Sequence, residues 1–150
     1  MTARALTDLS AGTIVATVEI AAAPERVFAA LSTAEVAEWW GSPDLYRVTR
    51  WTADLRPGGA WRSEGVDANG KSFSVSGRIL EVDPPRLLVQ TWNYDWDSGG
   101  STIVRYQVEP IPSGTRLTVR HEGFLPDSAD CRSHAIGWER VLGWLADHLR

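Results

Sequence analysis

Residues 128–150 read SADCRSHAIGWERVLGWLADHLR, and this stretch decides the fold. Its apolar residues recur at helical spacing, which predicts a single long helix from about Ser128 to Arg150. Val141 and Trp144 widen an apolar stripe whose centre consists of Cys131, Ala135, Trp138, Leu142, Leu145 and Leu149. A stripe this long has to be buried against a second layer of structure.

The second layer is predicted between residues 47 and 122, where apolar and polar residues alternate as they do in strands that bury one face. The pattern predicts six consecutive strands in an antiparallel meander. Turn residues separate these strands at 57–59, 67–70, 83–85, 98–101 and 112–114. The positions expected to face the helix are Trp51, Ala53, Leu55, Trp61, Ser63, Phe73, Val75, Gly77, Ile79, Val104, Tyr106, Val108, Leu117, Val119 and His121. The register of the strand at 86–94 stays open, because residues 87–89 are all apolar.

The N-terminal part of the chain adds one strand and two short helices. Residues 13–20 alternate between apolar and polar side chains, which predicts a strand rather than the core of a signal peptide. Pro24 suits the first turn of a helix, and Thr33 is placed to cap a second helix that ends at Trp39. Residues 1–12 lack periodicity and are expected to form a flexible arm. The whole pattern predicts an α+β fold in which a seven-stranded, curved antiparallel sheet wraps round the C-terminal helix.

Composition narrows the classes of function. The 150 residues carry a formal net charge of −4, and the basic residues are scattered, so we expect no nucleic-acid partner. No apolar run is long enough to span a membrane, so we expect no membrane partner. The one cysteine, Cys131, cannot form an internal disulfide, which favours a cytoplasmic location. Motifs of nucleotide-binding proteins, zinc proteases and serine hydrolases are missing, so we expect no cofactor.

Seven short segments stand out in order along the chain. They are residues 23–28 (APERVF), 56–59 (RPGG), 77–87 (GRILEVDPPRL), 91–92 (TW), 114–118 (GTRLT), 121–124 (HEGF) and 137–138 (GW), the last followed by Leu142 and Leu145. Together they resemble the family of homologues of the activator of the ninety-kilodalton heat-shock ATPase, which belongs to the START-like, or SRPBCC, superfamily. The resemblance begins at about residue 13 and implies a helix-grip fold, with a single START-like domain over residues 13–150.

A cavity is expected between the long helix and the sheet, because a twisted sheet wrapped round one helix cannot pack perfectly along its whole length. Tryptophan suits such a site, since it combines a large apolar area with one polar N–H group. Gly137 would let the helix approach a strand or a ligand closely. The candidate lining residues are Trp40, Trp51, Trp61, Ser63, Phe73, Val75, Tyr106, His121, Trp138, Val141 and Leu142.

Polar side chains on the inward face, and His134 near the start of the helix, are candidates for chemistry. His121 titrates near neutrality and would serve as a general base or as a hydrogen-bond donor to a ligand, with Tyr106 as a second donor. The structural interpretation, in which both side chains bond to backbone near a strand end, is favoured, because buried polar groups are usually satisfied within the protein. We therefore assign no catalytic residue. A metal site formed by His121, Glu122 and His134 is a further hypothesis, but the spacing is not diagnostic and we assign no metal ligand.

These features favour a protein that binds a small hydrophobic molecule, aromatic or acyl, rather than an enzyme. The resemblance implies two alternatives, namely an enzyme similar to the cyclases and aromatases of aromatic polyketides in the same superfamily, or a chaperone-interacting module. The eukaryotic heat-shock activator has an additional chaperone-binding domain, and we expect no counterpart of it within these 150 residues. Tyr94 and Trp96 are candidates for a homodimer contact or for the rim of the cavity.

Overall fold

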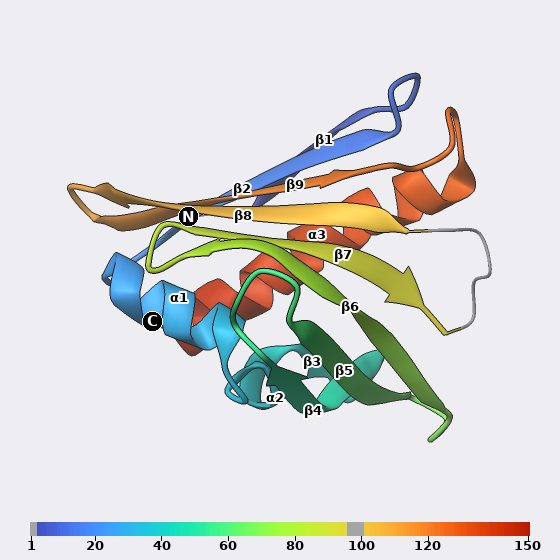
Figure 1. Cartoon of the computed structure of the whole chain (residues 1–150), viewed down its shortest axis with the longest axis horizontal. Helices are drawn as coiled ribbons and strands as arrows, with labels where there is room; N and C mark the ends of the chain where they lie inside the picture. Colours follow the sequence, from blue (N-terminus) through green and yellow to red (C-terminus); the bar gives the residue numbers. More distant parts are fainter. Residues whose placement is uncertain (1–2, 96–100) are drawn as a thin grey trace.

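The computed structural model describes residues 3–95 and 101–150, which form one curved sheet with a long helix across one of its faces (Figure 1). The strands are β1 (Arg4–Asp8), β2 (Thr13–Ile20), β3 (Gly41–Ser42), β4 (Tyr46–Ala53), β5 (Ala60–Asp67), β6 (Ser72–Asp83), β7 (Leu87–Tyr94), β8 (Thr102–Ile111) and β9 (Gly114–Glu122). The helices are α1 (Pro24–Ser32), α2 (Val36–Trp39) and α3 (Ala129–His148).

The strands of the described residues pair antiparallel in the order β1-β2-β9-β8-β7-β6-β5-β4-β3. From β3 to β9 each strand pairs with its neighbour in sequence, and β2 joins the meander by pairing with β9. In Figure 1, α3 runs along the sheet, while α1 and α2 lie together near its C-terminal end. This is a helix-grip fold of the α+β class, and the predicted fold class is confirmed.

Two strands were not predicted, so the sheet has nine strands among the described residues rather than the seven expected. Residues 1–12 were expected to be a flexible arm, but Arg4–Asp8 pairs along its whole length with β2. Most β1 side chains are exposed, so the strand forms through its backbone and carries no apolar alternation. The other missed strand, β3, has two residues and is too short for any periodicity.

The two short helices follow the predicted order with different ends. Pro24 occupies the first turn of α1, as expected. Thr33 does not cap α2; it ends α1, where its hydroxyl donates to the carbonyl of Ala29 at 2.7 Å. The second helix therefore begins only at Val36, where its one short turn places Trp39 in the core.

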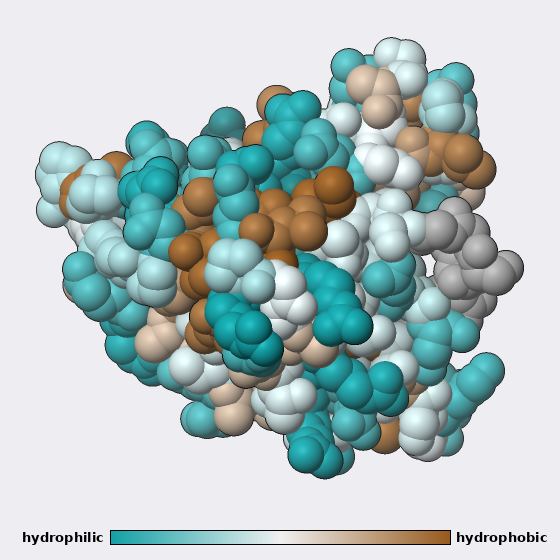
Figure 2. Space-filling view, in the orientation of Figure 1, coloured by the Kyte–Doolittle hydropathy of each residue, from teal (hydrophilic) through white to brown (hydrophobic). Residues whose placement is uncertain are grey.

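The alternation in the central strands is confirmed at nearly every predicted position. All the predicted inward residues are buried or partly buried except Leu55, which is 38% exposed because β4 ends at Ala53 and the chain turns there. In β7, whose register was open, Leu88 and Gln90 lie opposite Tyr106 and Val104 of β8 and so share their inward face. Of the alternate positions of β7, Leu87 and Val89 are also buried, whereas Thr91 and Asn93 are partly buried. Figure 2 shows a band of hydrophobic residues on this outer side of the sheet, over its central strands.

Ser128 caps the N-terminus of helix α3, where its hydroxyl accepts a hydrogen bond from the Cys131 N–H at 3.2 Å. Near its other end, the His148 ring lies 2.7 Å from a carboxylate oxygen of Glu35, which also pairs with Arg26 at 2.6 Å. These contacts tie the end of α3 to the short helices. Every residue at the centre of the predicted apolar stripe is buried, namely Cys131, Ala135, Trp138, Leu142, Leu145 and Leu149. Of the two residues that widen the stripe, Val141 is buried and Trp144 is partly buried.

The tight turn between β4 and β5 generates a stability prediction. The Gly59 carbonyl accepts a hydrogen bond from the Ile79 N–H at 2.8 Å, and a Cβ added at Gly59 would lie 1.9 Å from the carbonyl oxygen of Asp54. We expect Gly59→Ala to lower the free energy of unfolding by about 1–3 kcal/mol, because the backbone must move to admit the methyl group. Urea denaturation followed by circular dichroism measures the change.

The control is Gly137→Ala in α3, where an added Cβ meets nothing within 4 Å. This substitution should raise the free energy of unfolding by roughly 0.5–1 kcal/mol, because alanine is the better helix former. Equal stability of Gly59→Ala and the wild type would show that the turn is not constrained.

Candidate functional site

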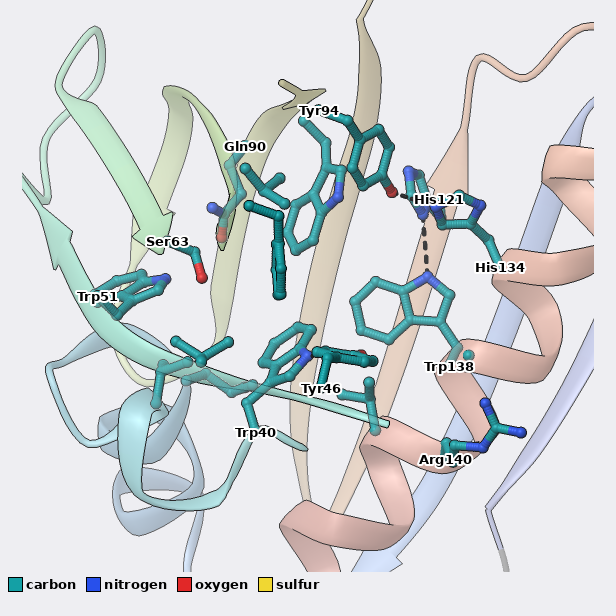
Figure 3. A pocket seen from close by; sticks show the side chains of 18 of the residues that line it. Trp40, Tyr46, Trp51, Ser63, Gln90, Tyr94, His121, His134, Trp138 and Arg140 are labelled. Atoms are coloured by element: carbon teal, nitrogen blue, oxygen red, sulfur yellow. Dashed lines mark hydrogen bonds between the residues drawn. The ribbon is translucent and has the colours of Figure 1, made fainter. Parts of the chain in front are cut away.

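A pocket of about 440 Å³ lies between α3 and the inward face of the sheet (Figure 3). Strands β4 to β9, the segment around Trp40 and one side of α3 supply its walls. All the candidate lining residues except Leu142 border it: Trp40, Trp51, Trp61, Ser63, Phe73, Val75, Tyr106, His121, Trp138 and Val141.

Leu142 is fully buried, but it does not border the pocket. Its neighbour Val141 does, because successive residues of an α-helix point in directions about 100° apart, at about 3.6 residues per turn. Leu142 therefore belongs to the packed core beside the pocket. The apolar stripe of α3 serves both the core and the pocket, and the sequence does not separate the two.

Tryptophan rings form much of the pocket wall. The ring of Trp92 lies 4.8 Å from that of Trp61 and 6.0 Å from that of Trp138, and Trp40 packs 5.9 Å from Trp138. These centroid separations are typical of favourable aromatic contacts. The rings thus hold each other in place at the wall of the pocket rather than filling it, since an open volume remains between them.

Several pocket residues were missing from the candidate list. Gln90 and Trp92 were missed because the register of β7 was open, although placing Trp92 inward would have brought Gln90 inward as well. Tyr46 was missed because it precedes the recognised alternation; its hydroxyl accepts from the Trp40 indole N–H at 3.2 Å. Tyr94 also borders the pocket, which agrees with its expected place at the rim, whereas Trp96 lies outside the described residues.

His121 is held by two side chains and is fully buried. Its Nδ1 lies 3.0 Å from the indole Nε1 of Trp138, and its Nε2 lies 2.7 Å from the hydroxyl of Thr102. An indole N–H can only donate, so Nδ1 accepts and the proton of the neutral ring sits on Nε2, which donates to Thr102. Burial, with a smaller effect of His134, lowers the pKa of His121 well below its usual value.

This geometry leaves neither ring nitrogen of His121 available to a ligand or a substrate. The hypothesis of a general base or ligand donor is therefore unsupported, and the structural interpretation describes the residue better. The partners differ from the expected backbone groups, because they are the side chains of Trp138 and Thr102. Tyr106 is also buried against the pocket, and burial raises its pKa, so its phenol stays protonated at neutral pH.

A second polar contact joins β7 to the first turn of α3. Nδ1 of His134 lies 2.7 Å from the carbonyl oxygen of Asp130 and must donate to it, because a carbonyl only accepts. In the neutral ring, Nε2 of His134 then accepts from the Tyr94 hydroxyl, and both side chains border the pocket (Figure 3). Burial raises the pKa of Tyr94 and keeps it protonated.

The structure does not support the hypothesis of a metal site formed by His121, Glu122 and His134. The rings of His121 and His134 do approach, with centroids 5.5 Å apart, but Glu122 is on the opposite side of β9 and pairs with Arg120 at 3.2 Å. Across residues 3–95 and 101–150, no three His, Cys, Asp or Glu side chains gather as metal ligands would.

None of the helices in that part of the chain is long and apolar enough to cross a membrane.

Comparison with known proteins identifies the family. The model of the family described as Activator of Hsp90 ATPase homolog 1-like protein matches residues 21–150. The chain belongs to this family. The sequence resemblance to homologues of the activator is thereby confirmed. Among curated proteins, no match was found.

Solved structures similar to this member of the Activator of Hsp90 ATPase homolog 1-like family cover nearly the whole chain. A protein from Rhodobacter sphaeroides is 25% identical, with a TM-score of 0.86 over 99% of this chain and 98% of that one. The AHSA1 protein from Silicibacter pomeroyi is 33% identical, with a TM-score of 0.77 over 91% and 96% of the two chains. CalU16 from Micromonospora echinospora, at 23% identity and a TM-score of 0.72 over 99% and 82%, shares the fold.

The buried His121 generates a prediction about pH. Its pKa is lowered in the folded protein relative to the unfolded value near 6.5. Below pH 6.5 the unfolded chain binds a proton that the folded protein excludes, so the free energy of unfolding falls as the pH falls. We expect the unfolding constant to rise by up to about tenfold per pH unit from pH 6.5 to pH 5 through this one group. Above pH 6.5 it should contribute no slope.

Urea denaturation at a series of pH values measures this slope. His121→Gln has no titrating ring and should show a shallower dependence between pH 6.5 and 5, whatever its stability at pH 7. The pKa of Glu35 is lowered from 4.5, mainly by its hydrogen bond with Arg26. Its protonation therefore changes the free energy of unfolding only below this pH range, in the wild type and in the variant alike. Identical slopes for the variant and the wild type would contradict the assignment.

Proposed function

We propose that this family member binds a small hydrophobic molecule, aromatic or acyl, in the pocket between α3 and the sheet. The observation that carries the proposal is an open pocket of about 440 Å³ lined by many aromatic side chains from elements far apart in the sequence. Protein interiors normally contain few voids larger than a water molecule. Pockets that hold small organic ligands measure roughly 300–1,000 Å³, and this one lies within that range.

The arrangement of the polar groups supports binding rather than catalysis. Both nitrogens of His121 are engaged by Trp138 and Thr102, and the phenols of Tyr94 and Tyr106 have raised pKa values. A general base must have a free lone pair within reach of the proton it removes, and these groups do not supply one. The proposed partner is therefore a ligand that is held and released unchanged. A cytoplasmic location is part of the proposal, supported by the single buried thiol of Cys131.

Gly137 offers a direct test, because it borders the pocket and an added Cβ there meets nothing within 4 Å. A leucine at this position would project into the pocket without displacing the backbone. The probe is N-phenyl-1-naphthylamine, an uncharged molecule whose fluorescence rises in apolar surroundings. We expect the wild type to bind it and Gly137→Leu to bind it at least about tenfold more weakly, because the side chain occupies the ligand volume.

The matched control is Gly143→Leu on the same helix. Gly143 also has open space at its Cβ, but it does not border this pocket. Both substitutions should improve helix propensity to the same extent, so a difference in binding reports the pocket alone. Native mass spectrometry of freshly purified protein would identify any retained ligand. If the wild type does not bind the probe, or Gly137→Leu binds it as well as the wild type does, the proposal is wrong.

A further inference from the structure

Gln90, in the middle of β7, is the least expected residue of the pocket. It is 2% exposed and borders the pocket on the inward face of the sheet. Its amide nitrogen Nε2 is buried and makes no hydrogen bond to any part of the chain that the structure describes. Figure 3 shows the amide pointing into the pocket, on the side where Ser63 and Trp51 lie.

An unpaired amide N–H group in such a position destabilises the folded protein, because it loses its hydrogen bonds to water and gains none. Leu88 and Trp92, the inward neighbours of Gln90 on the same strand, are apolar, so a leucine would suit position 90 for folding alone. The amide therefore has a use that folding does not explain. The side chain that carries this amide borders the space in which a ligand would lie.

A second unpaired N–H group, that of an indole, belongs to another residue of the pocket wall. Nε1 of Trp92 is buried and makes no hydrogen bond to the described residues. Both unpaired buried atoms, in Gln90 and in Trp92, are donors. The matching ligand atom is therefore an acceptor.

The charge of that acceptor follows from the side chains around the pocket. The charged residues that border it are Asp67 and Arg140; Arg140 is exposed, and Asp67 is only partly buried and accepts hydrogen bonds from the backbone of Asn69 and Lys71. His121 is neutral and fully engaged. No buried cation is thus present among the described lining residues to offset a carboxylate, whose dehydration without a partner is unfavourable.

We propose that the ligand is an uncharged aromatic molecule with a carbonyl oxygen that accepts a hydrogen bond from Nε2 of Gln90. The inference rests on the proposed function and narrows its ligand class. The tryptophan rings contact the flat part of the molecule, and Gln90 determines which flat molecules are preferred.

The test uses three probes that share the fluorene ring system and compete with N-phenyl-1-naphthylamine. Fluorenone has a carbonyl oxygen, fluorene has none, and fluorene-9-carboxylate carries a negative charge. We expect the wild type to bind fluorenone at least about tenfold more tightly than fluorene, because only fluorenone pairs the buried amide. Fluorene-9-carboxylate should bind most weakly.

Gln90→Leu should bind fluorenone and fluorene equally, and should itself melt at a higher temperature than the wild type. The matched control is Gln107→Leu, the same substitution on β8 at an exposed position, which should keep the preference for fluorenone. Gln90→Met is a second variant, in which a side chain of similar length has no N–H donor; it should also lose the preference. It keeps the test valid if Gln90→Leu does not fold.

The possible failures are distinguishable. Equal affinity of the wild type for fluorenone and fluorene, with the fluorescent probe still bound, would overturn the role of Gln90 and leave the hydrophobic pocket in place. Tightest binding of fluorene-9-carboxylate would overturn the neutral ligand class. Loss of the preference in Gln107→Leu would show that it does not arise at Gln90. If the wild type binds none of the molecules, the proposed function fails together with this inference.

Discussion

The hydrogen bond from the Trp138 indole to Nδ1 of His121 fixes the long helix on the sheet, and much of the structure depends on it. It joins α3 to β9, and the other ring nitrogen continues the connection to Thr102 on β8. Because all three groups are buried, loss of one partner would leave another unpaired in an apolar environment. The same contact sets the orientation of the Trp138 ring, which packs against Trp40 and Trp92 in the pocket wall. A structural hydrogen bond thus shapes the site without taking part in it.

The order and class of the elements could be predicted from the sequence because each one buries a single face. Period-two alternation marks β4 to β6, β8 and β9, and the apolar stripe marks α3. The prediction failed where burial carries no pattern. In β1 the side chains are mostly exposed and only the backbone pairs with β2, whereas β3 has too few residues to show a period.

The same reasoning explains which pocket residues were found. Aromatic residues at inward positions, such as Trp51 and Trp61, were found because alternation places them and their size makes them candidates. Gln90 and Trp92 were not found, since β7 is buried on both faces and residues 87–89 give no preference for either register. Pairing with β8 resolves the register, and that pairing is a long-range contact between strands that the local sequence does not encode. Leu142 shows a different limit of the sequence. Helical spacing correctly identifies it as buried, but it does not show whether a buried residue packs in the core or borders the pocket.

His121 and Gln90 show how buried polarity separates structure from function in this pocket. Both are almost completely buried and both border the same volume, so burial alone does not distinguish them. The difference lies in their partners: His121 has a partner for each nitrogen, whereas the amide nitrogen of Gln90 has none within the described chain. A buried group whose hydrogen bonds are all made within the protein stabilises the fold and gains no further hydrogen bond from a ligand. A buried donor without a partner destabilises the fold until a ligand supplies an acceptor. Titratable residues are the usual first candidates in a pocket, yet here the uncharged amide has the stronger physical reason to meet the ligand.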